Sequence, residues 1–195
     1  ITTSYTYKKV YEGNSKFIDN IGFPIIVESE IKFLENKRNF NFYHGNSKQR
    51  FKEKGSNFIR DSFIYLNNKY KERHQFNLAK TMPYNKYLEF INKKVDCVVD
   101  QTYAYDPGIN ALISMAKGKI VFGGCETAYM ESLPIDKPPL INIKPSTKHI
   151  IFQIEHFLDN LTKVNEISKE GHGFVSDYHD HIKISEKYVN TWKMI

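Results

Sequence analysis

A basic loop carries the side chains best suited to hold an anion. It runs from His44 to Gly55 and leads into an expected helix, with Arg50 and Lys54 near its end. A guanidinium fork and an ammonium group supply the positive charge that a bound diphosphate needs, and a helix N-terminus adds to it. Lysine-rich loops are also ordinary solvated surface, so the loop by itself leaves both interpretations open.

A second candidate anion site lies where Pro107 and Gly108 begin another expected helix. The first backbone N–H groups of a helix have no partner within it, and here they belong to Gly108, Ile109 and Asn110. Glycine also allows a ligand to approach the backbone closely. A plain turn is the alternative, but the position directly after the clearest strand of the chain favours a binding site.

The histidines near the C-terminus raise the question of a metal site. His179, Asp180 and His181 follow His172 in the sequence. Alternate positions on a helix point to different faces, and no cysteine or well-spaced third ligand accompanies them. We therefore expect no metal ion. The sequence also contains no Gly-x-Ser-x-Gly, Walker or zinc-ligand pattern.

Two smaller groups of residues have both a functional and a structural interpretation. Tyr103, Tyr105 and Tyr129 suit a ring platform for a sugar or base, but aromatic residues make up 14% of the chain, which favours packing. Asp96 and Asp100 lie on one face of an expected strand, roughly 13 Å apart, so they do not form a carboxylate pair.

The segments that must position these residues alternate between strands and helices. Short apolar runs predict strands at 40–44, 76–79, 95–100, 120–122 and 140–143. Capped or amphipathic segments predict helices that start at Ser56, Pro83, Gly108, Thr127 and Ser146. This alternation predicts an α/β fold with an open, mostly parallel sheet covered by helices on both faces. Ligands of such sheets bind beyond the carboxyl ends of the strands, where both candidate anion sites lie.

The two ends of the chain differ from this alternating pattern. Residues 1–38 show no clean period and contain several glycines and a proline, which predicts a loop or interdomain linker. Residues 39–195 are expected to form the folded domain. From Leu161 onward the pattern predicts helices, broken near Gly171 and Gly173.

Composition and charge limit the classes of protein to which this chain can belong. Its 195 residues, 41% of them hydrophobic, suffice for one domain with a sizeable core. Apolar runs are shorter than the roughly 20 residues that span a bilayer. The net charge of +6 favours anionic partners, but the basic residues are scattered among acids, so we expect no nucleic acid. Cys97 and Cys125 lie in apolar runs, which fits free thiols in the reducing cytoplasm.

The order of these motifs resembles the donor-binding half of group 1 glycosyltransferases, which have the GT-B fold. Residues 96–121 resemble that family's pattern of an aspartate-strand, a loop, a glycine and a helix that ends in Gly-x-Pro-Val. Lys54-Gly55 resembles the family's basic Lys-Gly step, and residues 161–192 resemble its closing helices. The resemblance covers about residue 39 to the C-terminus, and it implies a Rossmann-like domain that is one half of a GT-B fold.

The resemblance implies roles for the two cations and for the loop that follows the second strand. Arg50 and Lys54 would contact the donor diphosphate and assist its departure. The loop around Thr81, Met82 and Pro83 would line the base.

The resemblance also assigns the turn and helix that follow the third strand. Gly108, Ile109 and Asn110 would offer backbone N–H groups to the donor phosphates, and Asp106 would lie near the donor sugar. Ile113 would face the donor ribose.

At Ile113 the chain departs from the family pattern. The family has a glutamate there that holds the ribose hydroxyls, and isoleucine offers no acceptor. The family's other acidic residue aligns with Tyr105, one position from Asp106. The alternative is therefore a non-catalytic binding or scaffold domain descended from a glycosyltransferase.

The function that the resemblance implies is donor binding in a retaining, hexosyltransferase-like enzyme of bacterial surface polysaccharide or glycoconjugate synthesis. Its partners would be a nucleotide-sugar donor, which is a substrate and not a cofactor, and its own N-terminal GT-B domain in a longer chain. Because that domain normally supplies the acceptor site, this segment alone would be inactive. A cytoplasmic location is expected, with peripheral contact to the inner face of the membrane.

The same resemblance concerns the C-terminal helix, which in GT-B proteins crosses back to the N-terminal domain. Ile182, Ile184, Tyr188, Val189 and Trp192 are therefore expected to leave an apolar surface on this chain.

Overall fold

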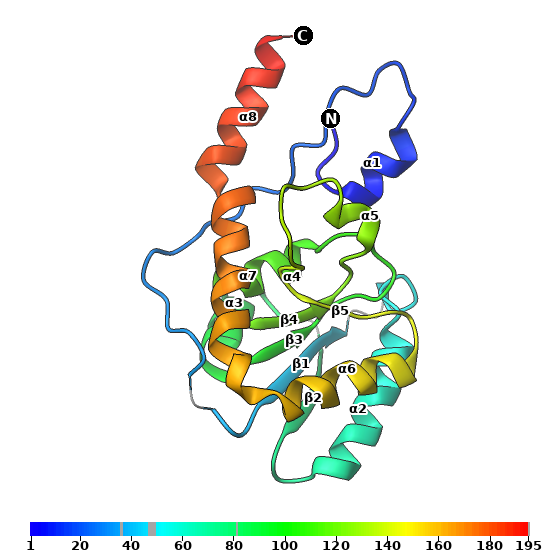
Figure 1. The fold of residues 1–195 in the computed structure, drawn as a ribbon, viewed down its shortest axis with the longest axis vertical. Helices are drawn as coiled ribbons and strands as arrows, with labels where there is room; N and C mark the ends of the chain where they lie inside the picture. The colour runs from blue at the N-terminus through cyan, green and yellow to red at the C-terminus, as the bar shows by residue number, and fades with distance from the viewer. Residues whose placement is uncertain (36, 47–49, 81, 195) are drawn as a thin grey trace.

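The computed structural model describes residues 1–35, 37–46, 50–80 and 82–194. Its centre is a five-stranded sheet in the order β2-β1-β3-β4-β5, with every strand pair parallel (Figure 1). The strands are β1 Asn41–Asn46, β2 Gln75–Lys80, β3 Cys97–Val99, β4 Ile120–Gly123 and β5 Ile141–Asn142. This confirms the predicted α/β fold with an open parallel sheet. Because the strands run the same way, their carboxyl ends meet at one edge of the sheet.

Helices cover both faces of the sheet. On one face lie α2 Ser56–Tyr70 and α6 Thr147–Asp159, whose apolar residues pack with Phe42, Cys97 and Phe122. On the other face lie α3 Tyr84–Lys94, α4 Ile109–Ala116 and α7 Val164–Tyr178, which pack with Tyr43, Val98 and Val121. Consecutive strand residues thus enter opposite cores, as the period of a strand requires.

The helix starts follow from local capping, with one correction. The Ser146 hydroxyl accepts a hydrogen bond from the His149 N–H and caps α6, as predicted. Gly55, not Ser56, is the N-cap of α2. The Ser56 hydroxyl does not cap the helix, because it is hydrogen-bonded to His44.

The ends of the chain differ from the predicted secondary structure at two points. A short helix, α1 Tyr5–Tyr11, lies inside residues 1–38, which were expected to be a loop or interdomain linker, and Ser4 caps it. The expected break near Gly171 and Gly173 is absent, because α7 continues through both residues. A side chain at Gly171 would press against Pro139 and Met115, so this glycine serves close packing.

The remaining elements are α5 Thr127–Met130, which lies between β4 and β5, a 3₁₀ turn Leu161–Lys163 before α7, and the C-terminal α8 His181–Lys193. Helix α8 rises beyond the layered body (Figure 1). Single parallel bridges tie Thr2 to Asn20 and Ile25 to Asp180. Cys97 and Cys125 are free and buried, as expected. Among the described residues, no helix has the length and apolar character needed to cross a membrane.

Candidate functional site

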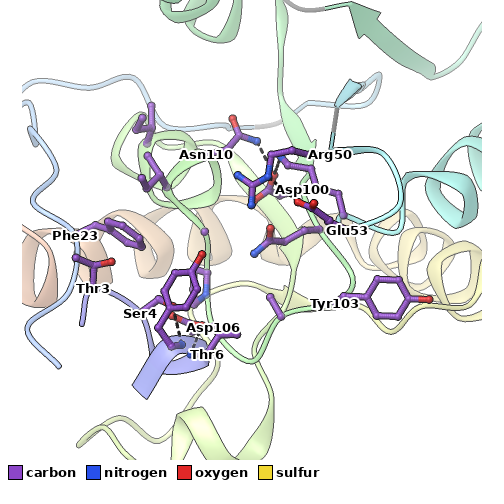
Figure 2. Close-up of a pocket in the computed structure, with 18 of the residues that line it drawn as sticks. Thr3, Ser4, Thr6, Phe23, Arg50, Glu53, Asp100, Tyr103, Asp106 and Asn110 are labelled. Atoms are coloured by element: carbon purple, nitrogen blue, oxygen red, sulfur yellow. Dashed lines mark hydrogen bonds and ion pairs between the residues drawn. The ribbon is translucent and has the colours of Figure 1, made fainter. Parts of the chain in front are cut away.

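A cavity of about 630 Å³ lies beyond the carboxyl ends of the strands (Figure 2). It gathers residues from the basic loop, the β3–α4 loop, α3, α4 and the N-terminal segment. The predicted site residues that line it are Arg50, Lys54, Asp106, Gly108, Ile109, Asn110 and Ile113. Met82 and Pro83 are not among its lining residues, whereas Tyr84 and Tyr87 of α3 are. Residues 47–49 and Thr81 lie outside the described part of the chain.

Lys54 is held at the cavity by a buried carboxylate at the end of β3. Its Nζ lies 2.9 Å from Asp100 Oδ1, and the two side chains are 16% and 2% exposed. The same oxygen accepts a hydrogen bond of 3.0 Å from Asn110 Nδ2. An ammonium group has three donors, and the bond to Asp100 uses one. Lys54 therefore has a defined direction and donors left for an anion.

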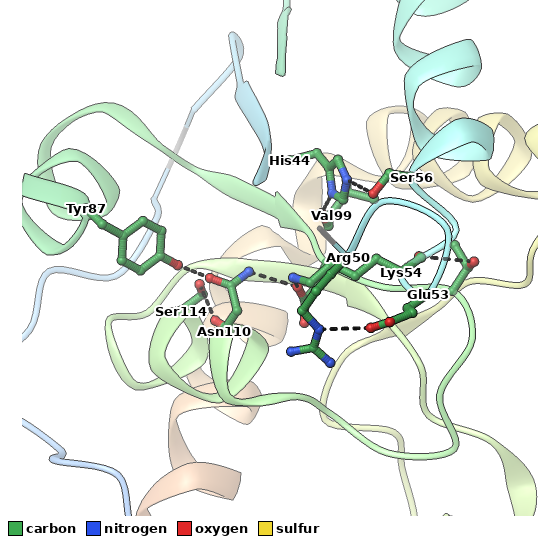
Figure 3. Close-up of polar contacts among 11 residues, drawn as sticks. His44, Arg50, Glu53, Lys54, Ser56, Tyr87, Val99, Asn110 and Ser114 are labelled. Atoms are coloured by element: carbon green, nitrogen blue, oxygen red, sulfur yellow. Dashed lines mark hydrogen bonds and ion pairs between the residues drawn. The ribbon is translucent and has the colours of Figure 1, made fainter. Parts of the chain in front are cut away.

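Asn110 extends this network to α3 (Figure 3). Because its Nδ2 donates to Asp100, its Oδ1 is the acceptor for the Tyr87 hydroxyl. Burial raises the pKa of Tyr87, so the phenol stays protonated and can donate. The network therefore joins the basic loop, β3, α4 and α3 around one end of the cavity.

Arg50 is placed differently from Lys54. Its Nε donates to Glu53 Oε2 at 3.2 Å, and both side chains are largely exposed at the cavity mouth. An exposed pair of this kind contributes little to stability, so a ligand can exchange for Glu53 at small cost.

His44 lies in β1, ahead of the loop that carries Lys54, and the sequence assigns it no role. Its Nδ1 is 2.7 Å from the Val99 carbonyl, which can only accept, so Nδ1 carries the proton. Nε2 then accepts from the Ser56 hydroxyl at 2.8 Å. Burial lowers the pKa of His44, which keeps the ring neutral. This fully buried ring ties β1 and β3 to the first turn of α2 beside Lys54. The sequence signal was only its place at the end of a strand.

The first turn of α4 opens on the cavity. The N-cap of α4 is Gly108, which has no side chain to accept a hydrogen bond from the N–H groups of the first turn. A Cβ at Gly108 would lie 3.1 Å from the Gln101 amide and 3.2 Å from Asp100 Oδ2. Glycine therefore permits the close packing of this turn against the end of β3.

Asp106 lines the cavity, but α1 uses both of its carboxylate oxygens. Oδ2 accepts from the Tyr5 N–H at 2.8 Å, and Oδ1 accepts from the Thr6 N–H at 3.0 Å and the Thr6 hydroxyl at 2.6 Å. Burial raises the pKa of Asp106, and the bonds from Thr6 oppose that rise. Of the three tyrosines considered for a ring platform, Tyr105 and Tyr129 both pack against Tyr5. Tyr103 lies apart from them, where it lines the cavity and packs edge-on against Phe58.

The sequence and the fold were compared with those of known proteins. No protein-family model matches the sequence, and no curated protein sequence matches it significantly. Solved structures do match its fold. Sucrose-phosphate synthase from Thermosynechococcus elongatus has a TM-score of 0.69 at 12% identity, over 99% of this chain and 57% of that one. HepE from Anabaena, in complex with UDP and glucose, has a TM-score of 0.58 at 14% identity, over 81% of this chain and 49% of HepE.

A third match is a mutant of S. aureus TarM in complex with fondaparinux, alpha-GlcNAc-glycerol and UDP. Its TM-score is 0.63 at 10% identity, over 97% of this chain and 43% of TarM. The chain has the fold of one half of a GT-B glycosyltransferase. It spans about half the length of these structures.

Ile113 is the residue at which this GT-B half departs from the expected pattern. It lines the cavity, is half-buried, and packs against the core that contains Leu112 and Met115. The position is therefore open to the cavity on one side and part of the core on the other.

Charge in the cavity of this GT-B half is nearly balanced. Among the described residues that line it, Arg50 and Lys54 are cationic, and Glu53, Asp100 and Asp106 carry carboxylates. Attraction for a diphosphate therefore depends on how Lys54, Arg50 and the α4 N-terminus are directed, and not on an excess of positive charge. Among the described residues, no group of three or more His, Cys, Asp or Glu side chains is placed to hold a metal ion.

Proposed function

We propose that this chain is the nucleotide-sugar donor-binding half of a retaining, hexosyltransferase-like glycosyltransferase of bacterial surface polysaccharide or glycoconjugate synthesis. The observation that carries the proposal is the cavity beyond the strand ends, where Lys54, Arg50 and the first turn of α4 converge in a GT-B half-fold. HepE, which shares this fold, was crystallised with UDP and glucose. We place the protein in the cytoplasm, with peripheral contact to the inner face of the membrane.

The reaction would break the bond between the anomeric carbon and the diphosphate oxygen of the donor. The diphosphate leaves with the bonding electrons, and an acceptor hydroxyl bonds to that carbon and releases its proton. Lys54, Arg50 and the α4 N-terminus would stabilise the negative charge that develops on the leaving group. The acceptor site and the group that takes the proton would belong to an N-terminal GT-B domain of a longer chain, so the 195 residues alone would not complete the transfer.

Titration calorimetry with UDP, GDP, ADP and dTDP tests this proposal. Lys54→Gln keeps a hydrogen bond to Asp100 but removes the charge, and Arg50→Ala changes an exposed side chain. Each should weaken binding of the preferred diphosphate by about 10- to 150-fold, because a charge-assisted hydrogen bond contributes about 1.5–3 kcal/mol.

Lys52→Ala is the matched control, because Lys52 is exposed in the same loop but does not line the cavity. Its affinity should stay within about twofold of the unmodified chain. If none of the four diphosphates binds, the donor-site proposal is overturned.

A specific observation supports a second candidate, a non-catalytic domain with this fold. Among the described residues, both cations that line the cavity are paired with carboxylates, and Ile113 offers no acceptor for a ribose. Ile113→Glu separates the two functions. If the cavity binds a nucleotide, the new carboxylate should find the ribose hydroxyls and tighten binding of UDP by up to about tenfold. A lower melting temperature with no gain in binding supports the non-catalytic domain, because the carboxylate is then buried without a partner.

A further inference from the structure

The N-terminal segment forms one wall of the cavity, which is otherwise lined by residues between 50 and 113. Its members that line the cavity are Thr3, Ser4, Thr6, Tyr7 and Phe23. Figure 2 shows Thr3, Ser4 and Thr6 on the side of the cavity away from Arg50 and Asn110. The cavity thus has a charged end, which carries Arg50 and Lys54, and an opposite wall formed by residues 3–7. We call residues 3–7 the hydroxyl-bearing wall.

Asp106 joins this wall to the β3–α4 loop. Its three bonds to Tyr5 and Thr6 are 2.6 to 3.0 Å long, and the residue is only 6% exposed. A carboxylate at the first turn of a helix also interacts favourably with the helix dipole. Thr6 returns the contact, since its hydroxyl oxygen accepts from the Tyr105 N–H at 3.3 Å. With both oxygens occupied, Asp106 holds α1 in place and has little capacity left for a ligand.

Apolar packing holds the same helix from the other side. Tyr5 is buried in the core, with its ring centroid 5.7 Å from that of Tyr129 and 6.2 Å from that of Tyr105. The direction of the hydroxyl-bearing wall is therefore set by one buried aromatic ring and one buried carboxylate.

Two hydroxyl groups of the wall remain available to a ligand. The Ser4 hydroxyl caps α1, and the Thr6 hydroxyl donates to Asp106. Thr3 and Tyr7 line the cavity, and within the described part of the chain their hydroxyls make no hydrogen bond. A hydroxyl donates and accepts, and the wall carries no charged side chain, so it suits a neutral, hydroxyl-rich group.

We propose that the hydroxyl-bearing wall contacts the sugar of a bound nucleotide sugar through Thr3 and Tyr7, and that Asp106 is the positioning residue that anchors this wall. The inference rests on the proposed function, because the charged end must hold the diphosphate for the sugar to reach the wall. It assigns sugar recognition to the segment of 1–38 that the sequence presents as a linker.

Two pairs of variants test the two parts of this inference in the 195-residue chain. Thr3→Val and Tyr7→Phe remove only the wall hydroxyls. Asp106→Asn and Thr6→Val remove bonds that anchor α1, and Thr6→Ser, which keeps the hydroxyl, is the conservative control. The measurements are hydrogen exchange of the α1 amides without ligand, and calorimetric titration with UDP and with UDP-glucose.

Thr3→Val and Tyr7→Phe should each lower the affinity for UDP-glucose by roughly 2- to 10-fold, with unchanged affinity for UDP and unchanged exchange. Asp106→Asn and Thr6→Val should speed exchange at Tyr5 and Thr6 by at least about tenfold and lower the affinity for UDP-glucose, whereas Thr6→Ser should match the unmodified chain.

Two results overturn the inference. One is an unchanged UDP-glucose affinity in both hydroxyl variants while UDP still binds, and the other is unchanged α1 exchange in Asp106→Asn. A chain that binds neither UDP nor UDP-glucose contradicts the proposed function, and the exchange measurement, which needs no ligand, still decides whether Asp106 anchors α1.

Discussion

Lys54 owes its direction to two neighbours, Gly55 and Asp100. Asp100 bonds the ammonium group, and Gly55 turns the chain into α2 with a φ of +66°, a conformation that favours glycine. A Cβ at Gly55 would overlap the Thr102 side chain. The backbone N–H of Thr102 also donates a hydrogen bond to the Lys54 carbonyl at 3.0 Å. The cation is therefore positioned by a backbone turn as much as by its ion pair.

Gly55→Ala should lower the free energy of unfolding by about 2 kcal/mol or more, because alanine pays about 1–2 kcal/mol in this left-handed conformation and must also displace Thr102. Urea unfolding measures the change. Gly173→Ala is the control of opposite sign: Gly173 lies inside α7 with open space around its missing side chain, so alanine should add about 0.5–1 kcal/mol. Equal effects of the two substitutions would contradict this account of Gly55.

At the scale of elements, the N-terminal segment and the C-terminal helices meet at His179, between α7 and α8. The backbone of Ile25 bonds to the His179 carbonyl at 2.7 Å and to the His181 N–H at 2.9 Å. His179 Nδ1 donates to the Phe23 carbonyl at 3.2 Å. Because Phe23 lines the cavity, this junction connects the start of α8 to the cavity.

Burial lowers the pKa of His179 to about 4. In the unfolded chain the pKa is about 6.5, so between these values the unfolded state binds a proton that the folded state does not. Stability should therefore be highest above pH 6.5 and fall as the pH drops toward 4. By pH 5 this one residue should remove about 2 kcal/mol.

Chemical denaturation at pH 7 and pH 5 measures this dependence. His179→Gln keeps a donor for Phe23 but does not titrate, so its stability should change less between the two pH values. Burial also lowers the pKa of His44, His74 and His149, so some dependence should persist in the variant. An identical dependence in both proteins would show that His179 does not titrate as described.

The central elements could be predicted from the sequence because their signals are local. The strands around 97–99 and 120–123 are continuous apolar runs, and α6 has both a cap and an apolar stripe. The short helix α1 could not, because seven residues do not form a stable helix alone and its anchor, Asp106, lies 100 residues away. The predicted helix break at Gly171 was wrong because glycine usually weakens a helix, whereas here it permits close packing.

The candidate site divides in the same way. The position of the cavity could be predicted, because parallel strands bring their carboxyl ends together. The basic loop after β1 and the glycine-bearing loop after β3 both follow such strand ends. The pairing of Lys54 with Asp100, the buried His44 and the wall from residues 3–7 depend on which loops meet in space. Those contacts are tertiary, and no spacing along the chain encodes them.

At the scale of the whole molecule, α8 leaves an apolar stripe uncovered. Ile182 and Val189 lie seven residues apart, two turns along the same face, and Trp192 lies beside them at 61% exposure. Ile184 is fully buried and the Tyr188 hydroxyl donates to the Gly22 carbonyl, so these two do not belong to the exposed surface that was expected. The stripe lies where α8 rises beyond the sheet layers (Figure 1). Under the proposed function, this stripe would contact an N-terminal GT-B domain.

If this stripe normally has a partner, the 195-residue chain should self-associate through α8, because burial of exposed apolar surface between two molecules is favourable. Sedimentation velocity at increasing concentration should show dimers or larger species, and Ile182→Lys combined with Trp192→Lys should return the chain to a monomer. Phe152→Lys is the matched control: Phe152 is also 61% exposed but lies on α6, so its removal should leave the association unchanged. The double variant should keep its affinity for UDP, since α8 does not line the cavity. A concentration-independent monomer, or a chain that transfers glucose from UDP-glucose to an acceptor by itself, would show that these residues need no second domain.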